Sequence, residues 1–257
     1  MNKVAFITGG TSGIGRELSK LCNNGGYDVY AVGLDPNPLD ENEYFCDVTN
    51  FTELNESVDK LEKIDLLVCS AGFGISGSLE LCDHELTKKL FDVNYFGVLN
   101  TIKVCLPKMS SNSKIIIIGS CCGLFPLPFR ANYCASKAAV NSLAKGLKME
   151  LSRTKIKVCV INPGDVKTPF IYNRIKNFET NERYNERVKN AQDIVDRRND
   201  KRMSVKTCAN KIFKICGHKN LRSSYIIGFK FKCLYILSKI LPEGLFIKLT
   251  NKFFGGL

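Results

Sequence analysis

The segment TGGTSGIG at residues 8–15 lies directly between a short apolar run and a stretch with helical spacing, and it constrains the fold more than any other feature. A chain that turns from a buried strand straight into a helix presents open backbone N–H groups and the positive end of the helix dipole at that turn. Glycines leave room there for a phosphate, which side chains would block. The segment therefore predicts a turn that binds a pyrophosphate; the alternative is a tight turn without a ligand.

Short apolar runs alternate with helix-length segments over the first 160 residues. The predicted strands are 3–7, 28–33, 44–48, 65–70, 114–119 and 155–161, and the predicted helices are 13–24, 50–63, 83–109, 131–153 and 204–217. Most strands are apolar at consecutive positions, as expected where both faces are covered. Too few residues separate the second strand from the third for a full helix. The pattern predicts an α/β fold with a doubly wound parallel sheet.

The formal net charge of +12 is concentrated near the C-terminus. Residues 201–257 hold twelve Lys or Arg and a single acid, Glu243. We expect one domain at 1–220 and a basic amphipathic appendage of the same domain at 221–257. The apolar positions of this appendage are 233, 234, 237, 240 and 241 and then, beyond Pro242, 245, 249 and 253. Such helices can pack as a lid, rest on an anionic membrane surface or contact a partner.

The twelve cysteines match no disulfide or metal-binding pattern. There is no CxxC pair, and the two histidines, His84 and His218, are far apart, so we expect reduced thiols and no metal site. No uncharged apolar run is long enough to span a membrane, and the apolar start at 4–7 is too short for a secretory signal. We expect a cytoplasmic protein. The basic tail lacks the motifs that would predict nucleic-acid binding.

Tyr133 and Lys137 are spaced by one helical turn, and Ser120 ends the strand that precedes them. Lowering the pKa of a tyrosine from about 10 to about 7 takes about 4 kcal/mol. A positive charge about 4–5 Å away supplies about 3–4 kcal/mol at an effective dielectric constant of about 20. Lys137 is therefore expected to lower the pKa of Tyr133, which would exchange a proton with a substrate oxygen that Ser120 holds.

With these motifs in this order, residues 3–170 resemble the single-domain short-chain dehydrogenase/reductase family, which implies a Rossmann-type fold. Asn94, Ser120, Tyr133 and Lys137 match the family's catalytic tetrad, in which the asparagine supports a proton-relay water. Asp47 matches the aspartate beside the adenine ring, and PGDVKT at 163–168 matches the segment that lines the nicotinamide. The family usually has Asn-Asn-Ala-Gly where this chain has CSAG at 69–72, which implies a less rigid sheet locally.

The resemblance implies NAD or NADP as cofactor. The residues assigned to it are Thr8, Gly9, Thr11, Ser12, Gly13, Ile14, Gly15, Asp35, Asp47, Val48, Ala71, Gly72, Asn94, Tyr133, Lys137, Pro163, Gly164, Val166 and Thr168. Asp35 follows the second strand, where an acid favours the ribose hydroxyl of NAD and repels the 2′-phosphate of NADP. The sequence thus favours NAD, although Arg16 beside the glycine turn could serve NADP.

An apolar loop separates the predicted catalytic serine from the tyrosine, and in the family this loop forms one wall of the substrate cleft. The predicted pocket residues are Phe73, Leu124, Phe125, Leu127, Phe129 and Phe170, together with a substrate loop at about 166–203. Such a lining favours a hydrophobic alcohol or ketone over a sugar. The segment around Tyr133 is similar to that of hydroxysteroid and retinol dehydrogenases. The alternative is that these residues only pack the loop.

The resemblance predicts an NAD(P)-dependent oxidoreductase that interconverts a secondary alcohol and a ketone on a small steroid-, retinoid- or lipid-like substrate. By analogy with the family, we expect a homo-oligomer. The alternative is a catalytically silent dinucleotide-binding regulatory or scaffold protein that could contact a membrane. A complete Asn94, Ser120, Tyr133 and Lys137 set favours the enzyme, since a binding protein has no use for it.

Overall fold

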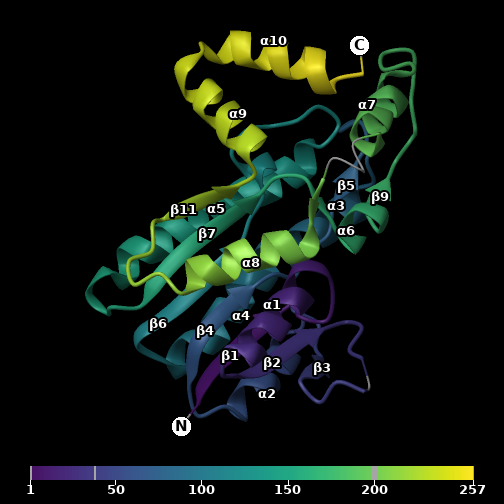
Figure 1. The fold of residues 1–257 in the computed structure, drawn as a ribbon. Helices are drawn as coiled ribbons and strands as arrows, with labels where there is room; N and C mark the ends of the chain where they lie inside the picture. Colours follow the sequence, from purple (N-terminus) through teal and green to yellow (C-terminus); the bar gives the residue numbers. More distant parts are fainter. Residues whose placement is uncertain (1, 38, 198–201, 257) are drawn as a thin grey trace.

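The computed structural model describes residues 2–37, 39–197 and 202–256, and its centre is a seven-stranded parallel sheet (Figure 1). The strand order is β11-β7-β6-β4-β1-β2-β3. The strands are β1 (Lys3–Thr8), β2 (Tyr27–Gly33), β3 (Glu43–Phe45), β4 (Ile64–Cys69), β6 (Met109–Ile118), β7 (Lys157–Pro163) and β11 (Ser224–Ile227). All six pairings are parallel, which confirms the predicted doubly wound α/β fold.

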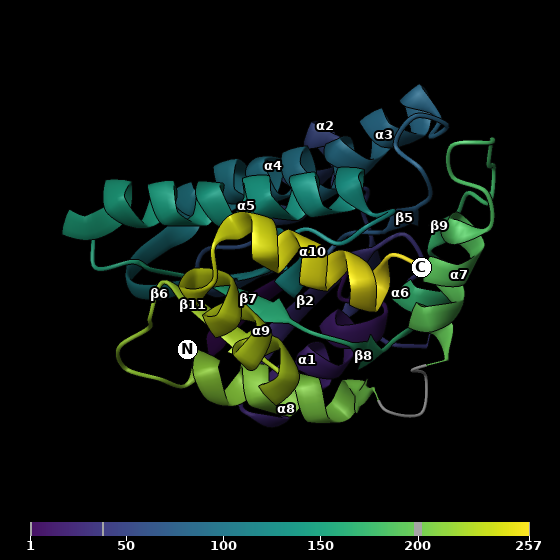
Figure 2. The same ribbon diagram turned by 90° about the horizontal axis from the view of Figure 1, so that it is seen from above.

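Helices cover both faces of the sheet, as Figure 2 shows from above. One face carries α1 (Gly13–Asn24) and α8 (Val205–Cys216), and the other carries α2 (Phe51–Asp59), α4 (Gly97–Cys105) and α5 (Ala131–Glu150). Successive side chains of a strand point to opposite faces, so Ile115 and Ile117 pack under α4 and α5 while Ile116 packs under α8. This two-sided burial explains the consecutive apolar residues in the sequence.

The described residues between β2 and β3 form no helix, as predicted; the backbone N–H of Ala31 donates to the carbonyl of Asn42 at 2.8 Å. β3 is shorter than the predicted strand 44–48, because Asp47 turns the chain by accepting from the N–H and hydroxyl of Thr49. Asn50 then begins α2, since its side-chain oxygen accepts from the N–H groups of the first helical turn.

The segment between β7 and α8 folds over the carboxyl edge of the sheet. Its elements are β8 (Val166–Lys167), α6 (Pro169–Tyr172), β9 (Ile175–Lys176), α7 (Arg187–Asp196) and β10 (Met203–Ser204); β9 pairs with β5 (Ile75–Ser76). The sequence predicts an exposed helix or mobile loop over 173–203. Among the described residues of that range, however, Val188, Ala191 and Gln192 are buried, because α7 packs against the C-terminal end of the chain.

The C-terminal segment is built into the fold. β11 is the edge strand of the main sheet, and α9 (Phe229–Ile240) and α10 (Glu243–Phe254) lie above its carboxyl edge (Figures 1 and 2). The boundary predicted at residue 220 therefore falls just before a strand of the sheet. No helix within the described residues is both long and apolar enough to cross a bilayer.

The apolar stripes predicted in this segment pack only in part. Leu234 of α9 and Leu241 just after it pack with Phe231 on the cluster around Tyr133, whereas Leu237 and Ile240 are exposed. In α10, Phe253 is exposed and Phe246 is buried. Both helices have apolar residues around most of their circumference, so spacing alone did not identify the packed face.

Candidate active site

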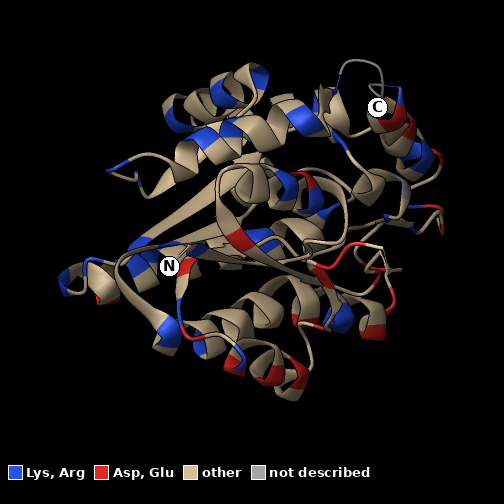
Figure 3. Cartoon of the chain, turned by 60° about the horizontal axis from the view of Figure 1, so that its bottom comes forward, with Lys and Arg blue, Asp and Glu red and all other residues tan. Residues whose placement is uncertain are grey.

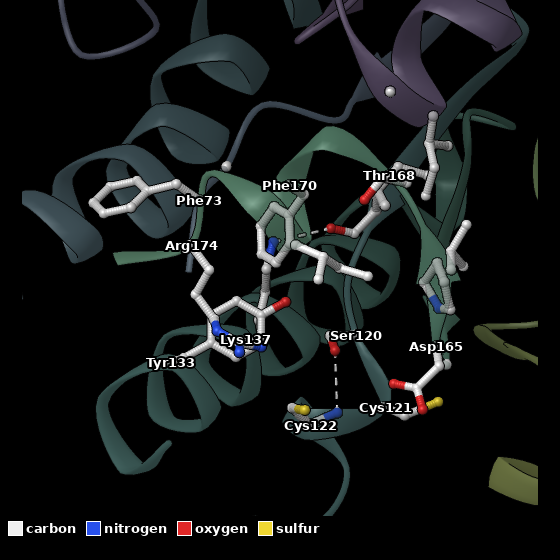
Figure 4. Close-up of a pocket in the computed structure, with 18 of the residues that line it drawn as sticks. Phe73, Ser120, Cys121, Cys122, Tyr133, Lys137, Asp165, Thr168, Phe170 and Arg174 are labelled. Atoms are coloured by element: carbon white, nitrogen blue, oxygen red, sulfur yellow. Dashed lines mark hydrogen bonds between the residues drawn. The ribbon is translucent and has the colours of Figure 1, made fainter. Parts of the chain in front are cut away.

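A cavity of about 310 Å³ opens at the carboxyl edge of the sheet, between the glycine-rich turn and α5 (Figure 4). Gly9, Ser12 and Gly13 line it on the side of α1. Tyr133 and Lys137 line it on the side of α5. The topology therefore brings together two motifs that are more than a hundred residues apart in the sequence.

The glycine turn has the shape of a phosphate cradle. Gly9 and Gly13 have φ angles of +63° and +51°, a region that favours glycine. A Cβ on Gly9 would lie 2.7 Å from the backbone nitrogen of Ala71, and one on Gly15 would lie 2.1 Å from the Gly9 carbonyl oxygen. The Ser12 side chain makes no capping hydrogen bond, which leaves the N–H groups of the first α1 turn available to a ligand. The residues present thus fit a dinucleotide pyrophosphate.

Tyr133 and Lys137 are both buried and lie on the same face of α5. The ammonium of Lys137 donates to the carbonyl of Ile118 at 3.3 Å. A Cβ on Gly72 would lie 3.4 Å from this ammonium and 2.9 Å from the side-chain oxygen of Asn94, so the two groups flank Gly72. The ring of Tyr133 packs on Phe170 with the centroids 5.8 Å apart.

Asn94 lies in a π-helical turn, Asp92–Phe96, between α3 (His84–Phe91) and α4. Such turns widen a helix locally and are frequent at functional sites. The Asn94 amide accepts from the N–H of Phe73 and donates to the Phe73 carbonyl, both at 3.0 Å, and it also donates to the Ser136 hydroxyl. Asn94 therefore ties the segment after β4 to α5 from behind the cavity.

Ser120 is held by a residue that the sequence analysis did not single out. Its backbone N–H donates to the side-chain oxygen of Asn162 at 2.9 Å, and its hydroxyl accepts from the N–H of Cys122. Asn162 is fully buried at the end of β7 and also exchanges hydrogen bonds with Asn141 of α5. Asn162 thus fixes the end of β6 relative to α5.

The structure contradicts the predicted lowering of the Tyr133 pKa. Burial raises the pKa of Tyr133 above its ordinary value, and the nearby Cys122 adds to this effect. Hydrogen bonding by Ser120 and the charge of Arg130 act in the opposite direction but do not outweigh burial. Burial also lowers the pKa of Lys137 to about 8, because its ammonium is as poorly solvated as the phenolate would be.

The comparison with known proteins agrees with this geometry. Residues 3–177 match the model of the family described as short chain dehydrogenase. The chain belongs to the short-chain dehydrogenase/reductase family. It is accordingly an NAD(P)-dependent oxidoreductase, as predicted.

Relatives match over nearly the whole chain. A probable short-chain type dehydrogenase/reductase, VdlC, of Helicobacter pylori is 32% identical, and the match covers 93% of each chain. A 3-ketodihydrosphingosine reductase of Bacteroides thetaiotaomicron is 31% identical over 95% of this chain and 94% of its own. A short chain dehydrogenase of Burkholderia cenocepacia, solved in complex with NADP, is 22% identical with a TM-score of 0.78, covering 96% of this chain and 97% of that one.

Most residues assigned to the cofactor from sequence line the cavity. These are Gly9, Ser12, Gly13, Ile14, Ala71, Gly72, Tyr133, Lys137, Pro163, Gly164, Val166 and Thr168. Others shape the site from behind: Thr8 is buried at the end of β1, Thr11 in the glycine turn and Val48 in the turn before α2, and Gly15 permits the close turn. Asp47 and Asp35 lie outside this cavity, at the edge formed by β2 and β3.

Arg16, the residue that could favour NADP, is paired with an acid. Its guanidinium forms two hydrogen bonds of 2.7 Å with the Glu43 carboxylate. This pairing raises the pKa of Arg16, and the negative charges of Asp35 and Asp40 contribute to the increase. Three carboxylates therefore surround one guanidinium at the edge where β2 ends.

The apolar loop of 121–130 contributes less to the cavity than predicted. Of the loop residues predicted to line the cavity, Leu127 does so, but Leu124, Phe125 and Phe129 do not. The other two predicted pocket residues, Phe73 and Phe170, lie outside this loop and also line the cavity. Phe125 is buried against Phe246, and Phe129 packs on Tyr184 and under Arg187, because α10 and the segment before α7 cover this loop.

The cavity also contains residues that the sequence analysis missed. They are chiefly Arg130, Arg174, Arg202, Phe231 and Phe254. Arg130 directly precedes the helix that carries Tyr133. Its positive charge at the end of an otherwise apolar loop could have identified it as a cavity residue from the sequence. The other four lie on segments whose folding over the cavity depends on long-range contacts, which leave no local pattern.

Proposed function

We propose that this enzyme interconverts a ketone and a secondary alcohol on a largely apolar substrate, with Tyr133 as the acid and base. The observation that supports this role is the meeting of Tyr133, Lys137 and Ser120 with the glycine turn in one cavity. The nicotinamide cofactor supplies or accepts the hydride. Ser120 positions the substrate oxygen, and Tyr133 gives it a proton or takes one away.

The pKa shifts are consistent with a proton donor in the direction of reduction. A raised pKa keeps the Tyr133 phenol protonated at neutral pH, as an acid requires. Lys137, with a pKa of about 8, can lose and regain a proton near neutral pH. Because Lys137 lines the same cavity as Tyr133, one helical turn further along α5, we propose that it replaces the proton that Tyr133 transfers.

A panel of apolar ketones and alcohols tests this proposal by following the nicotinamide absorbance with either cofactor. We expect turnover of several ketones of steroid-, retinoid- or lipid-like character. Silence across the whole panel, together with tight dinucleotide binding, would instead favour the regulatory or scaffold alternative.

We further propose a preference for NAD over NADP, supported by the carboxylates around Arg16. The 2′-phosphate of NADP would approach Asp35, Asp40 and Glu43, whose negative charges repel it. Arg16 already forms two hydrogen bonds with Glu43, whose carboxylate offsets the positive charge that would attract the phosphate.

Replacing Glu43 by Gln should shift this preference toward NADP. Glu43→Gln removes one negative charge and releases Arg16, so the ratio of kcat/KM with NADPH to that with NADH should rise about tenfold, or about 1.4 kcal/mol. Initial rates with both cofactors measure the ratio. Glu80→Gln, which breaks the exposed ion pair with Arg183, is the matched control. An unchanged ratio in Glu43→Gln would contradict the role given to Arg16.

We also propose that α9 and α10 rest on an anionic membrane surface. Phe229, Ile240 and Phe253 are 81%, 72% and 61% exposed. Five lysines lie on the same two helices: Lys230, Lys232, Lys239, Lys248 and Lys252. Figure 3 shows Lys and Arg along the helices at the top of the view, whereas Asp and Glu are more frequent in the lower half, where Lys and Arg also occur. Exposed apolar side chains among cations suit an interface with anionic lipid.

Co-sedimentation with vesicles of phosphatidylserine and phosphatidylcholine tests this surface. The wild type should sediment with them at low salt and less at high salt, because salt screens the lysines. The triple substitution Phe229→Ser, Ile240→Ser and Phe253→Ser should reduce the bound fraction at least about tenfold, since about 2 kcal/mol of burial is lost per large side chain. Leu39→Ser, at a position 90% exposed on the β2–β3 connection, is the control. A wild type that stays in the supernatant would refute the proposal.

A further inference from the structure

Two guanidinium groups lie in the substrate part of the cavity and are used by none of the steps above. Arg130 directly precedes α5, three residues before Tyr133, and Arg174 follows α6. Arg174 is only 7% exposed. A Cβ on Gly74 would touch both the Phe170 ring, at 3.0 Å, and the Arg174 side chain, at 3.5 Å. Since Phe170 also packs on Tyr133, Arg174 borders the reacting end of the cavity (Figure 4).

The protein does not neutralise these two cations fully. Arg174 reaches one carboxylate, Asp196, at 3.5 Å, and that carboxylate lies closer to Lys176, at 2.6 Å. No ion pair joins Arg130 to an acid anywhere in the described residues. Burial and the charge of Arg130 lower the pKa of Arg174 to about 10, which shows that the positive charges add up at this point. A poorly solvated excess of positive charge attracts an anion.

Hydrogen-bond donors are also left over. Within the described part of the chain, Nη2 of Arg130 and Nε of Arg174 are buried and lack a hydrogen-bond partner. Arg174 uses Nη2 for Gln192 and Asp196, which anchors its guanidinium. Buried donors without partners cost free energy unless a ligand completes them. Two forked guanidinium groups, of which Arg174 is anchored, match the oxygens of a carboxylate or a phosphate.

The cofactor pyrophosphate does not account for this pair, because the glycine turn of α1 already provides its cradle. Arg130 instead lies on the substrate side, close enough to Tyr133 for its positive charge to oppose the increase that burial causes in the pKa of this residue. Both arginines share the cavity with the apolar side chains of Phe73, Leu127, Phe170 and Phe254. The site therefore combines an apolar surface with a concentrated positive charge.

We infer that Arg130 and Arg174 bind an anionic group of the substrate, so that the enzyme acts on apolar ketones or alcohols that carry a carboxylate or phosphate. This inference rests on the proposed function and specifies its substrate class. It also predicts discrimination: an amino ketone, whose ammonium would face two guanidinium groups, is a poor substrate.

Matched substrate pairs test this assignment. Long-chain oxo acids, differing in the spacing between ketone and carboxylate, are each compared with the methyl ester. Oxoalkyl phosphates are compared with the free alcohols, and the two series decide between carboxylate and phosphate. In the wild type, kcat/KM should be at least about tenfold higher for the anion in one series. Arg130→Met and Arg174→Met should lower it about 10- to 100-fold for the anion and less than about threefold for its neutral partner.

Controls separate charge from folding and from the reaction itself. Lys189→Met removes an exposed cation of α7 that does not line the cavity and should leave the preference unchanged. Arg130→Lys and Arg174→Lys keep the positive charge but lose the two-pronged guanidinium, so these variants should retain part of the preference for the anionic substrate. A direct readout is calorimetric binding of decanoate, which should weaken about tenfold or more in both Met variants, with methyl decanoate unaffected.

The outcomes distinguish this inference from the proposed function. Equal use of anionic and neutral ketones by the wild type, or equal losses for both in the Arg variants, overturns the inference and leaves the proposed function standing. Decanoate binding that depends on Arg130 and Arg174, in a protein that reduces no ketone, upholds the anion site and overturns the proposed function.

Discussion

Tyr133→Phe should lower kcat for ketone reduction at least about a thousandfold while dinucleotide binding changes less than about threefold. The substitution removes only the hydroxyl that exchanges the proton, and the ring remains to pack against Phe170. Steady-state rates give kcat, and quenching of NADH fluorescence gives the affinity for the cofactor. Affinity should persist because the glycine turn, which holds the pyrophosphate, is unchanged.

The control for this experiment is another tyrosine that makes hydrogen bonds. The Tyr225 hydroxyl on β11 accepts from the N–H of Arg222 and pairs with His218, away from the cavity. Tyr225→Phe should therefore leave kcat within about twofold of the wild type, as expected for a surface substitution. Turnover at the wild-type rate in Tyr133→Phe would remove this residue from the mechanism and leave the source of the proton open.

Short sequence patterns predicted those parts of the site whose shape depends only on neighbouring residues. The spacing of Tyr133 and Lys137 requires only a helix, and the turn of Gly9, Gly13 and Gly15 requires only a strand that leads into a helix. Both were therefore readable from short windows of sequence. The doubly wound parallel sheet followed as well, because alternating strands and helices form βαβ units that permit few topologies.

The pKa values and charges inside the cavity could not be predicted from short sequence patterns. The argument that Lys137 lowers the pKa of Tyr133 assumed two partly solvated groups, but α9 and α10 cover the site and burial dominates. Arg174 likewise enters the cavity only because its segment folds back over the carboxyl edge of the sheet. The sequence contained these residues without indicating what they would face.

Asn162 is another residue whose role depends on long-range contacts. Its side chain accepts from the N–H of Ser120 and from Asn141, and it donates to Asn141 and to the Ser224 hydroxyl. It thereby joins three strands' ends and α5 at a fully buried point. The residues near Asn162 in the sequence do not indicate this role, because every hydrogen-bond partner of its side chain is at least twenty residues away.

Asn162→Ala should lower the free energy of unfolding by about 2–4 kcal/mol, since it leaves buried donors and acceptors on Ser120 and Asn141 without partners. It should also lower kcat about a hundredfold, because Ser120 loses the bond that fixes its backbone and shifts away from the substrate oxygen. Urea unfolding and steady-state rates, measured on the folded fraction, give the two quantities.

Ser224→Ala provides the matched comparison because it removes one partner of Asn162 but leaves the bond to Ser120 in place. It should cost about 1 kcal/mol of stability and leave kcat within about twofold. If Ser224→Ala lowers kcat as much as Asn162→Ala does, the loss reflects general weakening of the sheet edge rather than the position of Ser120. If Asn162→Ala is destabilised but fully active once folded, Ser120 does not depend on Asn162 for its place in the reaction.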